Sequence, residues 1–176
     1  MAHLEEFRLA GNFAEIWQHM PMNRCENISL AKSWMENAIE EMASGNQLAF
    51  VTIDKKSNQL VGSTRMIRLD KVNKKLEIGY TFITPKYQRS YVNSHAKFLM
   101  LQHAFEHLAI ARVEICTHEN NQQSRTAIAR IGGQFEGILR KHRRNPDNSY
   151  RNTAMFSILD EEWPAVKQQL LRTGRN

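Results

Sequence analysis

Basic and hydroxyl side chains gather just before a helix in the middle of the chain, in the segment TPKYQRSYVNSHAK (84–97). Lys86 and Arg89 precede this helix, although a helix start usually gathers acidic residues, because its exposed N–H groups carry partial positive charge. The same N–H groups and the helix dipole are well suited to bind a phosphate. The segment therefore predicts a site for a phosphate or pyrophosphate. The alternative is that Lys86 and Arg89 are only solvated turn residues.

Other reactive or charged side chains support weaker hypotheses. His118 and Glu119 follow an apolar run and could line a substrate site, although loop residues of these types are usually solvated. Cys116 lies inside that run and is better explained as a core residue than as a nucleophile, since no His and Asp partners surround it in sequence. The basic run RKHRRNPDNSYR (140–151) could attract an acidic acceptor or nucleic acid, or it could be a solvated hairpin.

The helix that follows the basic loop is predicted from Asn93 onward. Four apolar residues lie on one of its faces at spacings of three and four: Phe98, Leu101, Phe105 and Leu108. A strand-like run at 76–83 precedes the helix, and another at 112–117 follows it. This order predicts a strand-helix-strand unit with parallel strands.

The rest of the pattern interleaves strands with helices, without a repeat or linker that would mark a second domain. Runs at 48–53, 60–69 and 76–83, joined by polar turns, predict an antiparallel meander, and two last strands are expected near 135–140 and 153–159. The fold class is α+β, with a mixed sheet and helices on its faces. The other helix signals are a cap at Ser29 or Ser33 with an end at Gly45, a cap at Asn120 or Asn121, and a start at Asp160.

Length and composition favour one domain over residues 1–176, because 41% hydrophobic residues in a chain of this length can bury a sizeable core. The formal net charge of +6 favours anionic partners. Cys25 and Cys116 have no metal-ligand spacing and are expected as free thiols in a reducing compartment. Without a signal pattern or an apolar run of about 18 residues, we expect a cytoplasmic protein that does not enter a membrane.

From Leu60 to Leu170 the sequence resembles a GNAT-fold N-acetyltransferase, of the branch that includes the amino-terminal acetyltransferases of ribosomal proteins. The resemblance implies a seven-stranded, mostly antiparallel mixed sheet, splayed between its fourth and fifth strands, with helices on both faces. Acetyl-CoA would lie in the opening, and a first strand could be short or missing here. Three stretches carry the likeness: LEIGYTFITPKYQRSYVNSHAKFLMLQHAFEHL, RVEICTHENNQQSRTAIARIGGQFEGILRKH and YRNTAMFSILDEEW.

The resemblance also assigns the cofactor-binding residues. The pyrophosphate loop of the family has the form Gln/Arg-x-x-Gly-x-Gly/Ala, and here Tyr91 and Asn93 occupy the two glycine places. Asn enters left-handed backbone geometry at modest cost, whereas Tyr does so poorly. Hydroxyl groups of Ser90 and Ser94 could replace contacts that closer backbone approach would give. The full set implied for acetyl-CoA is Phe82, Ile83, Gln88, Arg89, Ser90, Tyr91, Val92, Asn93, Ser94, Asn121 and Ser124.

Two residues are implied as catalytic. Glu77 lies fourteen residues before Tyr91, where acetyltransferases of this fold often keep a glutamate that acts as general base. Its alternative role is a cross-strand partner of Arg65 or Arg68. Asn121 and Ser124 match the Asn-x-x-Ser of the ribosomal-protein branch, in which the serine lies near the CoA sulfur. Both could equally cap a helix.

The expected activity is transfer of an acetyl group from acetyl-CoA to a primary amine, either a protein N-terminus or a small molecule. Two other classes stay open: a non-catalytic acyl-CoA-binding protein of the same fold, and a basic nucleic-acid-binding domain. No helix-turn-helix, zinc-ligand or aromatic RNA-binding motif supports the second of these. A homodimer is also left open.

Overall fold

The computed structural model describes residues 2–173. The chain divides into two compact units. The first unit comprises the described residues up to Arg68 together with Gly79–Asn93, and the second comprises Leu69–Ile78 and the described residues from Ser94 onward. Three elements of the chain continue from one unit into the other. The expectation of one domain over 1–176 stays a prediction.

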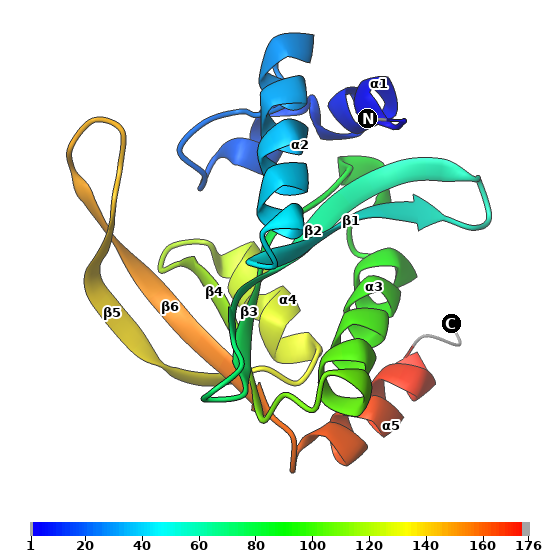
Figure 1. The fold of residues 1–176 in the computed structure, drawn as a ribbon, viewed down its shortest axis with the longest axis vertical. Coiled ribbons are helices and arrows are strands. Elements are labelled where there is room, and N and C mark those ends of the chain that lie inside the picture. Colours follow the sequence, from blue (N-terminus) through cyan, green and yellow to red (C-terminus); the bar gives the residue numbers. More distant parts are fainter. Residues whose placement is uncertain (1, 174–176) are drawn as a thin grey trace. The chain divides into compact units, whose positions relative to one another are not determined.

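The first unit begins with two helices and continues into the antiparallel pair β1 and β2 (Figure 1). Asn27 caps α2, since its side-chain oxygen accepts a hydrogen bond from the N–H of Leu30 at 2.9 Å. The expected cap at Ser29 or Ser33 is therefore wrong. Gly45 follows the helix with φ 77°, the left-handed geometry that glycine adopts without cost. The helices and strands of the chain up to Ile83 are α1 (Leu4–Gly11), a 3-10 turn (Ala14–Trp17), α2 (Ile28–Ala43), β1 (Gln47–Asp54), β2 (Gln59–Asp70) and β3 (Lys75–Ile83).

Aromatic side chains form the core of the first unit. The Phe82 ring lies 5.3 Å from the ring of Phe7 in an edge-to-face arrangement and 5.7 Å from that of Trp17. The next residue, Ile83, belongs to a different cluster, with Val61 and Val92. Successive strand residues point to opposite faces, so the end of β3 is buried on both sides.

The second unit holds the rest of the sheet. β4 (Arg112–His118) pairs in parallel with β3 over three residue pairs that end at Glu77 and Glu114, and antiparallel with β6 (Tyr150–Leu159) along its whole length. β5 (Gln134–Arg144) completes the strand order β1-β2-β3-β4-β6-β5. A short ladder between β3 and β4 agrees with the expected splay. Six strands form among residues 2–173 rather than the seven implied, because the N-terminal segment is helical.

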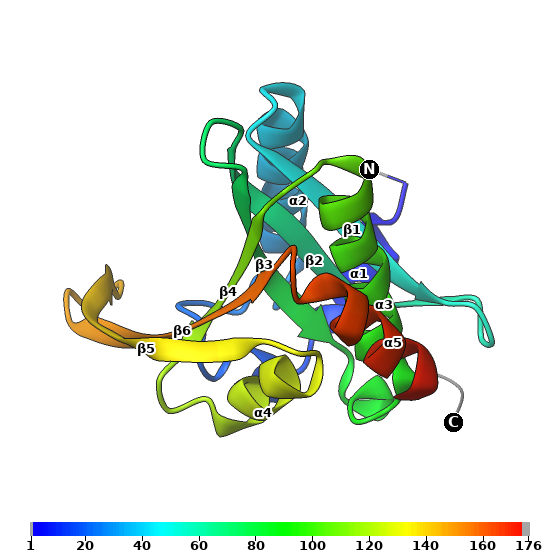
Figure 2. The same cartoon turned by 90° about the horizontal axis from the view of Figure 1, so that it is seen from below.

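Helices α3 (Tyr91–Gln102) and α5 (Trp163–Thr173) lie side by side (Figure 2). α3 continues into a π-helical turn, His103–His107. The predicted apolar face is confirmed for three of its residues: Leu101 is fully buried, and the rings of Phe98 and Phe105 lie 6.0 and 5.5 Å from that of Trp163. Leu108 is 37% exposed because the helix has ended before it. No helix among residues 2–173 combines the length and apolar character needed to cross a membrane.

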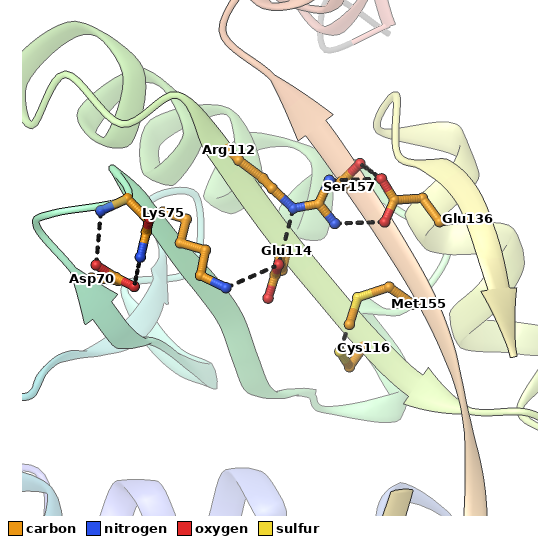
Figure 3. A network of polar contacts seen from close by, with 9 residues as sticks. Asp70, Lys75, Arg112, Glu114, Cys116, Glu136, Met155 and Ser157 are labelled. Carbon is orange, nitrogen blue, oxygen red and sulfur yellow. Dashed lines mark hydrogen bonds and ion pairs between the residues drawn. The ribbon is translucent and has the colours of Figure 1, made fainter. Parts of the chain in front are cut away.

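One face of the sheet in the second unit carries a network of charged side chains (Figure 3). Arg112 on β4 donates to Glu114 at 2.9 Å and to Glu136 on β5 at 2.7 Å. Ser157 on β6 also donates to Glu136, at 2.7 Å, and Lys75 on β3 lies 3.9 Å from Glu114. The network links side chains from four strands of the second unit.

Candidate functional site

The predicted pyrophosphate loop lies in the first unit and leads from a short 3-10 turn, Pro85–Tyr87, into α3. Its left-handed residue is Arg89, with φ 59°, and not Tyr91 or Asn93. Both of these residues, in the two glycine places, belong to the first turn of α3 and have ordinary helical backbone. The difficulty expected for tyrosine in a left-handed conformation therefore does not arise.

The Tyr91 side chain is anchored on the turn between β1 and β2. Its hydroxyl donates a short hydrogen bond to a carboxylate oxygen of Asp54, whose other oxygen accepts from the hydroxyl of Ser57 at 2.6 Å. The bonds from Ser57 and Tyr91 lower the pKa of Asp54 to about 2. The Tyr87 hydroxyl reaches the same turn and donates to Gln59 at 3.0 Å. These contacts attach the pyrophosphate loop to the turn between β1 and β2. Sequence reasoning missed them.

The remaining loop residues have defined local roles. Ser90 donates its hydroxyl hydrogen to the Tyr87 carbonyl at 2.6 Å, and its oxygen accepts from the N–H of Val92 at 3.3 Å, so it caps α3. The side-chain amide of Gln88 donates to the Ile83 carbonyl at 3.0 Å. Phe82, Ile83 and Val92 are 4%, 8% and 4% exposed, so their side chains are core and their backbone is what a ligand could contact. Ser94 is the first residue of the second-unit part of α3.

This local geometry suits an anion. Among residues 2–173, the backbone N–H groups of Arg89 and Ser90 donate to no other residue. They directly precede the first turn of α3, where the helix dipole is positive. The Arg89 side chain is exposed beside them. N–H donors, helix dipole and a guanidinium group together can hold a phosphate.

Glu77 lies in the second unit and is 2% exposed. The Nη2 atom of Arg143, on β5, lies 3.2 Å from one of its carboxylate oxygens. Arg65, one of the two alternative partners considered from the sequence, instead lies in the first unit against the Trp34 ring. Glu114, the register neighbour of Glu77 on β4, has its charge offset by Arg112. Glu77 is thus a deeply buried carboxylate held by a cation from a distant part of the chain.

Asn121 and Ser124 mark the start of α4 (Gln122–Arg130), also in the second unit. The Asn121 side chain accepts a hydrogen bond from the backbone N–H of Ser124 at 3.0 Å, which confirms one of the two predicted caps. Ser124 is half-buried, and its hydroxyl makes no hydrogen bond to any other residue among 2–173. A hydroxyl at a helix start with no protein partner can donate to a ligand.

The neighbouring candidates have local structural roles. The Nδ1 atom of His118 accepts a hydrogen bond from the backbone N–H of Asn120 at 3.1 Å. Cys116 contacts the sulfur of Met155 at 3.6 Å (Figure 3). The basic run at 140–151 forms the distal part of the β5–β6 hairpin, and only part of it is exposed. Arg143 and Arg151 are half-buried there, and Arg151 has a pKa lowered by burial and by the charge of Arg143.

Comparisons with known proteins identify the family of this chain. The acetyltransferase (GNAT) domain family matches residues 2–134. The putative ribosomal N-acetyltransferase YdaF of Bacillus subtilis is 34% identical over 113 residues, which cover 61% of this chain and 58% of YdaF. The uncharacterized N-acetyltransferase p20 of Bacillus licheniformis is 22% identical over 85% of this chain and 83% of its own length.

Solved structures show the same fold. A GCN5-related N-acetyltransferase from Brucella melitensis has a TM-score of 0.89 and 32% identity, covering 97% of this chain and 77% of that chain. Mycobacterium smegmatis RimJ, solved with CoA-disulfide, has a TM-score of 0.81 at 22% identity, covering 99% of this chain and 84% of that chain. On the family match and the first of these structures, the chain belongs to the GNAT family of acetyltransferases.

Proposed function

We propose that this protein transfers an acetyl group from acetyl-CoA to a primary amine, either a protein N-terminus or a small molecule. The observation that carries the cofactor assignment is the loop before α3, with two partnerless N–H groups at Arg89 and Ser90. This loop would hold the pyrophosphate of acetyl-CoA, which supplies an activated thioester. Two free cysteines, Cys25 and Cys116, are consistent with a cytoplasmic location.

Glu77 acts in this proposal as the general base. The attacking amine must be neutral, so its ammonium proton must be removed, and the Glu77 carboxylate accepts that proton through a water molecule. The Nη2 atom of Arg143 lies 3.2 Å from the carboxylate and holds it in position. Because Glu77 is buried and contacts Arg143, its carboxylate has a defined position, which the carboxylate of an exposed side chain would lack.

Ser124 supports the departing sulfur. As the thioester bond breaks, negative charge develops on sulfur, and the Ser124 hydroxyl donates a hydrogen bond to it. The Asn121 side chain is engaged with the Ser124 N–H and so fixes the start of α4 where this hydroxyl lies. Replacing Ser124 by Ala should lower turnover less than loss of the base does, because water can partly replace a hydroxyl at a half-buried position.

Thermal unfolding with and without ligand tests the cofactor assignment. A ligand that binds only the folded state stabilises it by RT ln(1 + [L]/Kd), about 2.7 kcal/mol at one hundred times Kd. Saturating acetyl-CoA should raise the melting temperature, and Arg89→Glu should weaken that rise by reversing a charge beside the loop. Lys32→Glu, an exposed charge reversal on α2, serves as the matched control. An unmoved melting temperature with acetyl-CoA would show that the cofactor assignment is wrong.

A further inference from the structure

The indole ring of Trp34, on α2, carries two guanidinium groups. The Cζ atom of Arg65, on β2, lies 4.3 Å from the ring centroid, and that of Arg24 lies 5.1 Å from it. The Tyr80 ring packs edge-on against Trp34 at 5.2 Å and lies 5.2 Å from the Arg65 guanidinium. All four residues belong to the first unit. We call them the Trp34 cluster.

Neither arginine of the cluster has a carboxylate partner among residues 2–173. Arg65 is 3% exposed and donates only to neutral oxygens, the Trp34 carbonyl at 3.1 Å and the Gln47 side chain at 3.5 Å. Arg24 is half-buried and makes no hydrogen bond or ion pair within the described chain. A guanidinium has five N–H donors, so most donors of both side chains are uncommitted.

This arrangement is unfavourable unless an anion completes it. Buried charges in proteins are normally paired, because removing a charge from water is costly. Burial lowers the pKa of Arg65; Tyr80 opposes that effect, and the like charge of Arg24 adds to it. Stacking on the Trp34 ring offsets part of this cost through cation–π attraction. Stacking on the ring face leaves the remaining N–H donors of both guanidinium groups without an acceptor among the described residues.

One further feature indicates space beside Arg65, and another indicates local backbone strain. A cavity of about 120 Å³ lies in the first unit, bordered by Trp34 and Arg65 but not by Arg24 or Tyr80, and otherwise mainly by apolar side chains. The Tyr80 backbone has φ 50°, a left-handed conformation that is rare for an aromatic residue and that clusters at functional sites.

We infer that the Trp34 cluster binds an oxyanion, a carboxylate or a phosphate, carried by the acceptor in addition to its amine. This inference rests on the proposed function, since the ligand is the acceptor. Arg24 and Arg65 donate charge-assisted hydrogen bonds to the oxyanion, and Trp34 holds both guanidinium groups in place. The protein would therefore acetylate amines that carry a nearby acid in preference to neutral or polybasic amines.

Matched peptides test the selectivity. Three tripeptide amides with a free amino terminus are compared as acceptors: Ser-Glu-Ala, Ser-Gln-Ala and Ser-phosphoserine-Ala. The KM for the glutamate or phosphoserine peptide should be at least about tenfold below that for the glutamine peptide, with similar kcat, because charge-assisted hydrogen bonds are about twice as strong as neutral ones. The peptide with the lower KM identifies carboxylate or phosphate as the preferred anion.

The variant Arg24→Gln should remove this preference, while the KM for acetyl-CoA stays constant. Arg24 is chosen because it is only half-buried and makes no hydrogen bond or ion pair among residues 2–173, so its loss should leave the fold intact. Lys32→Gln removes the same charge from an exposed position on α2 and should keep the preference. Equal KM values for the three peptides, or a preference that survives Arg24→Gln, would overturn the inference.

Calorimetry separates failure of this inference from failure of the proposed function. N-acetylglutamate has carboxylates but no amine, so it can occupy the cluster without being acetylated. Binding of N-acetylglutamate that Arg24→Gln weakens and Lys32→Gln does not would support the inference, even if none of the peptides were acetylated. Absence of N-acetylglutamate binding together with equal peptide KM values would exclude the anion subsite while leaving acetyl transfer intact.

Discussion

Replacing Glu77 by Gln separates a catalytic carboxylate from a structural one. Gln keeps the size and most of the hydrogen bonding of Glu77 but cannot accept the ammonium proton. Loss of a general base lowers turnover by about 10²–10⁴, which corresponds to roughly 2.7–5.5 kcal/mol in the activation free energy. Acetyl-CoA affinity should change little, because the pyrophosphate loop is a separate part of the chain.

The structure also sets the expected effect on stability. Glu77 is 3% exposed at its side chain and lies 3.2 Å from Arg143, whose side chain is 29% exposed. A hydrogen bond to a charged group contributes about 1.5–3 kcal/mol, and the partial exposure of Arg143 reduces this through solvent screening. We expect Glu77→Gln to lower the free energy of unfolding by about 1–2 kcal/mol, too little to unfold a typical domain.

Arg143→Gln is the matched control, because it removes the same ion pair from its other end and leaves the carboxylate in place. Steady-state kcat and KM are measured for both variants against pH, with urea unfolding alongside. The deficit of Glu77→Gln should shrink as pH rises, because more of the amine is then already neutral. If both variants lost activity equally, or if Glu77→Gln kept full turnover at neutral pH, Glu77 would be structural and His118 or Glu119 would be tested next.

Three further predictions concern stability and reactivity. In Gly62→Ala the new Cβ would lie 2.4 Å from the Phe82 carbonyl oxygen, so the two strands must separate, and urea denaturation should show a loss of about 1–3 kcal/mol; an unchanged midpoint would contradict this. Hydrogen bonds from Arg112 and Ser157 hold the pKa of Glu136 at about 2 against its ordinary 4.5, so its contribution to stability is complete above pH 4.5 and is lost as the pH falls toward 2. Urea midpoints of Glu136→Gln should therefore change less over that window than those of the unaltered protein, and equal pH dependence would refute the assignment. Burial raises the pKa of the Cys25 thiol to about 12, so iodoacetamide at mildly alkaline pH should label it only when urea unfolds the chain, and rapid labelling of the folded protein would contradict its burial.

Local patterns in the sequence predicted much of the fold. The apolar spacing of Phe98, Leu101 and Phe105 identified the buried face of α3, and Asn121 was one of two residues proposed to cap α4. Apolar spacing and helix capping depend on residues that are close together in the chain, so a single sequence is enough to recognise them. The β5–β6 hairpin extends further than its apolar residues indicated, because Arg143 pairs in register with Arg151 through the backbone.

The contacts that define the site could not be predicted in the same way. Arg143 and Glu77 are 66 residues apart in the chain, and Tyr91 and Asp54 are 37 apart. Only the fold brings each pair together, so neither residue type nor spacing indicates the contact. The basic run that contains Arg143 has the composition of a solvated hairpin, and that composition does not separate the half-buried Arg143 from the exposed Arg140 and Arg144.

Simultaneous measurement of CoA release and acceptor mass tests acetyl transfer most directly. The purified protein is incubated with acetyl-CoA and a panel of amines that includes the three peptides, free thiol is assayed over time, and each amine is examined by mass spectrometry. We predict amine-dependent CoA release, with one acetylated amine for every CoA and strong loss of both in Glu77→Gln. Stabilisation of the protein by acetyl-CoA without any acetylated amine or amine-dependent CoA release would contradict the account and indicate a binding protein of the same fold.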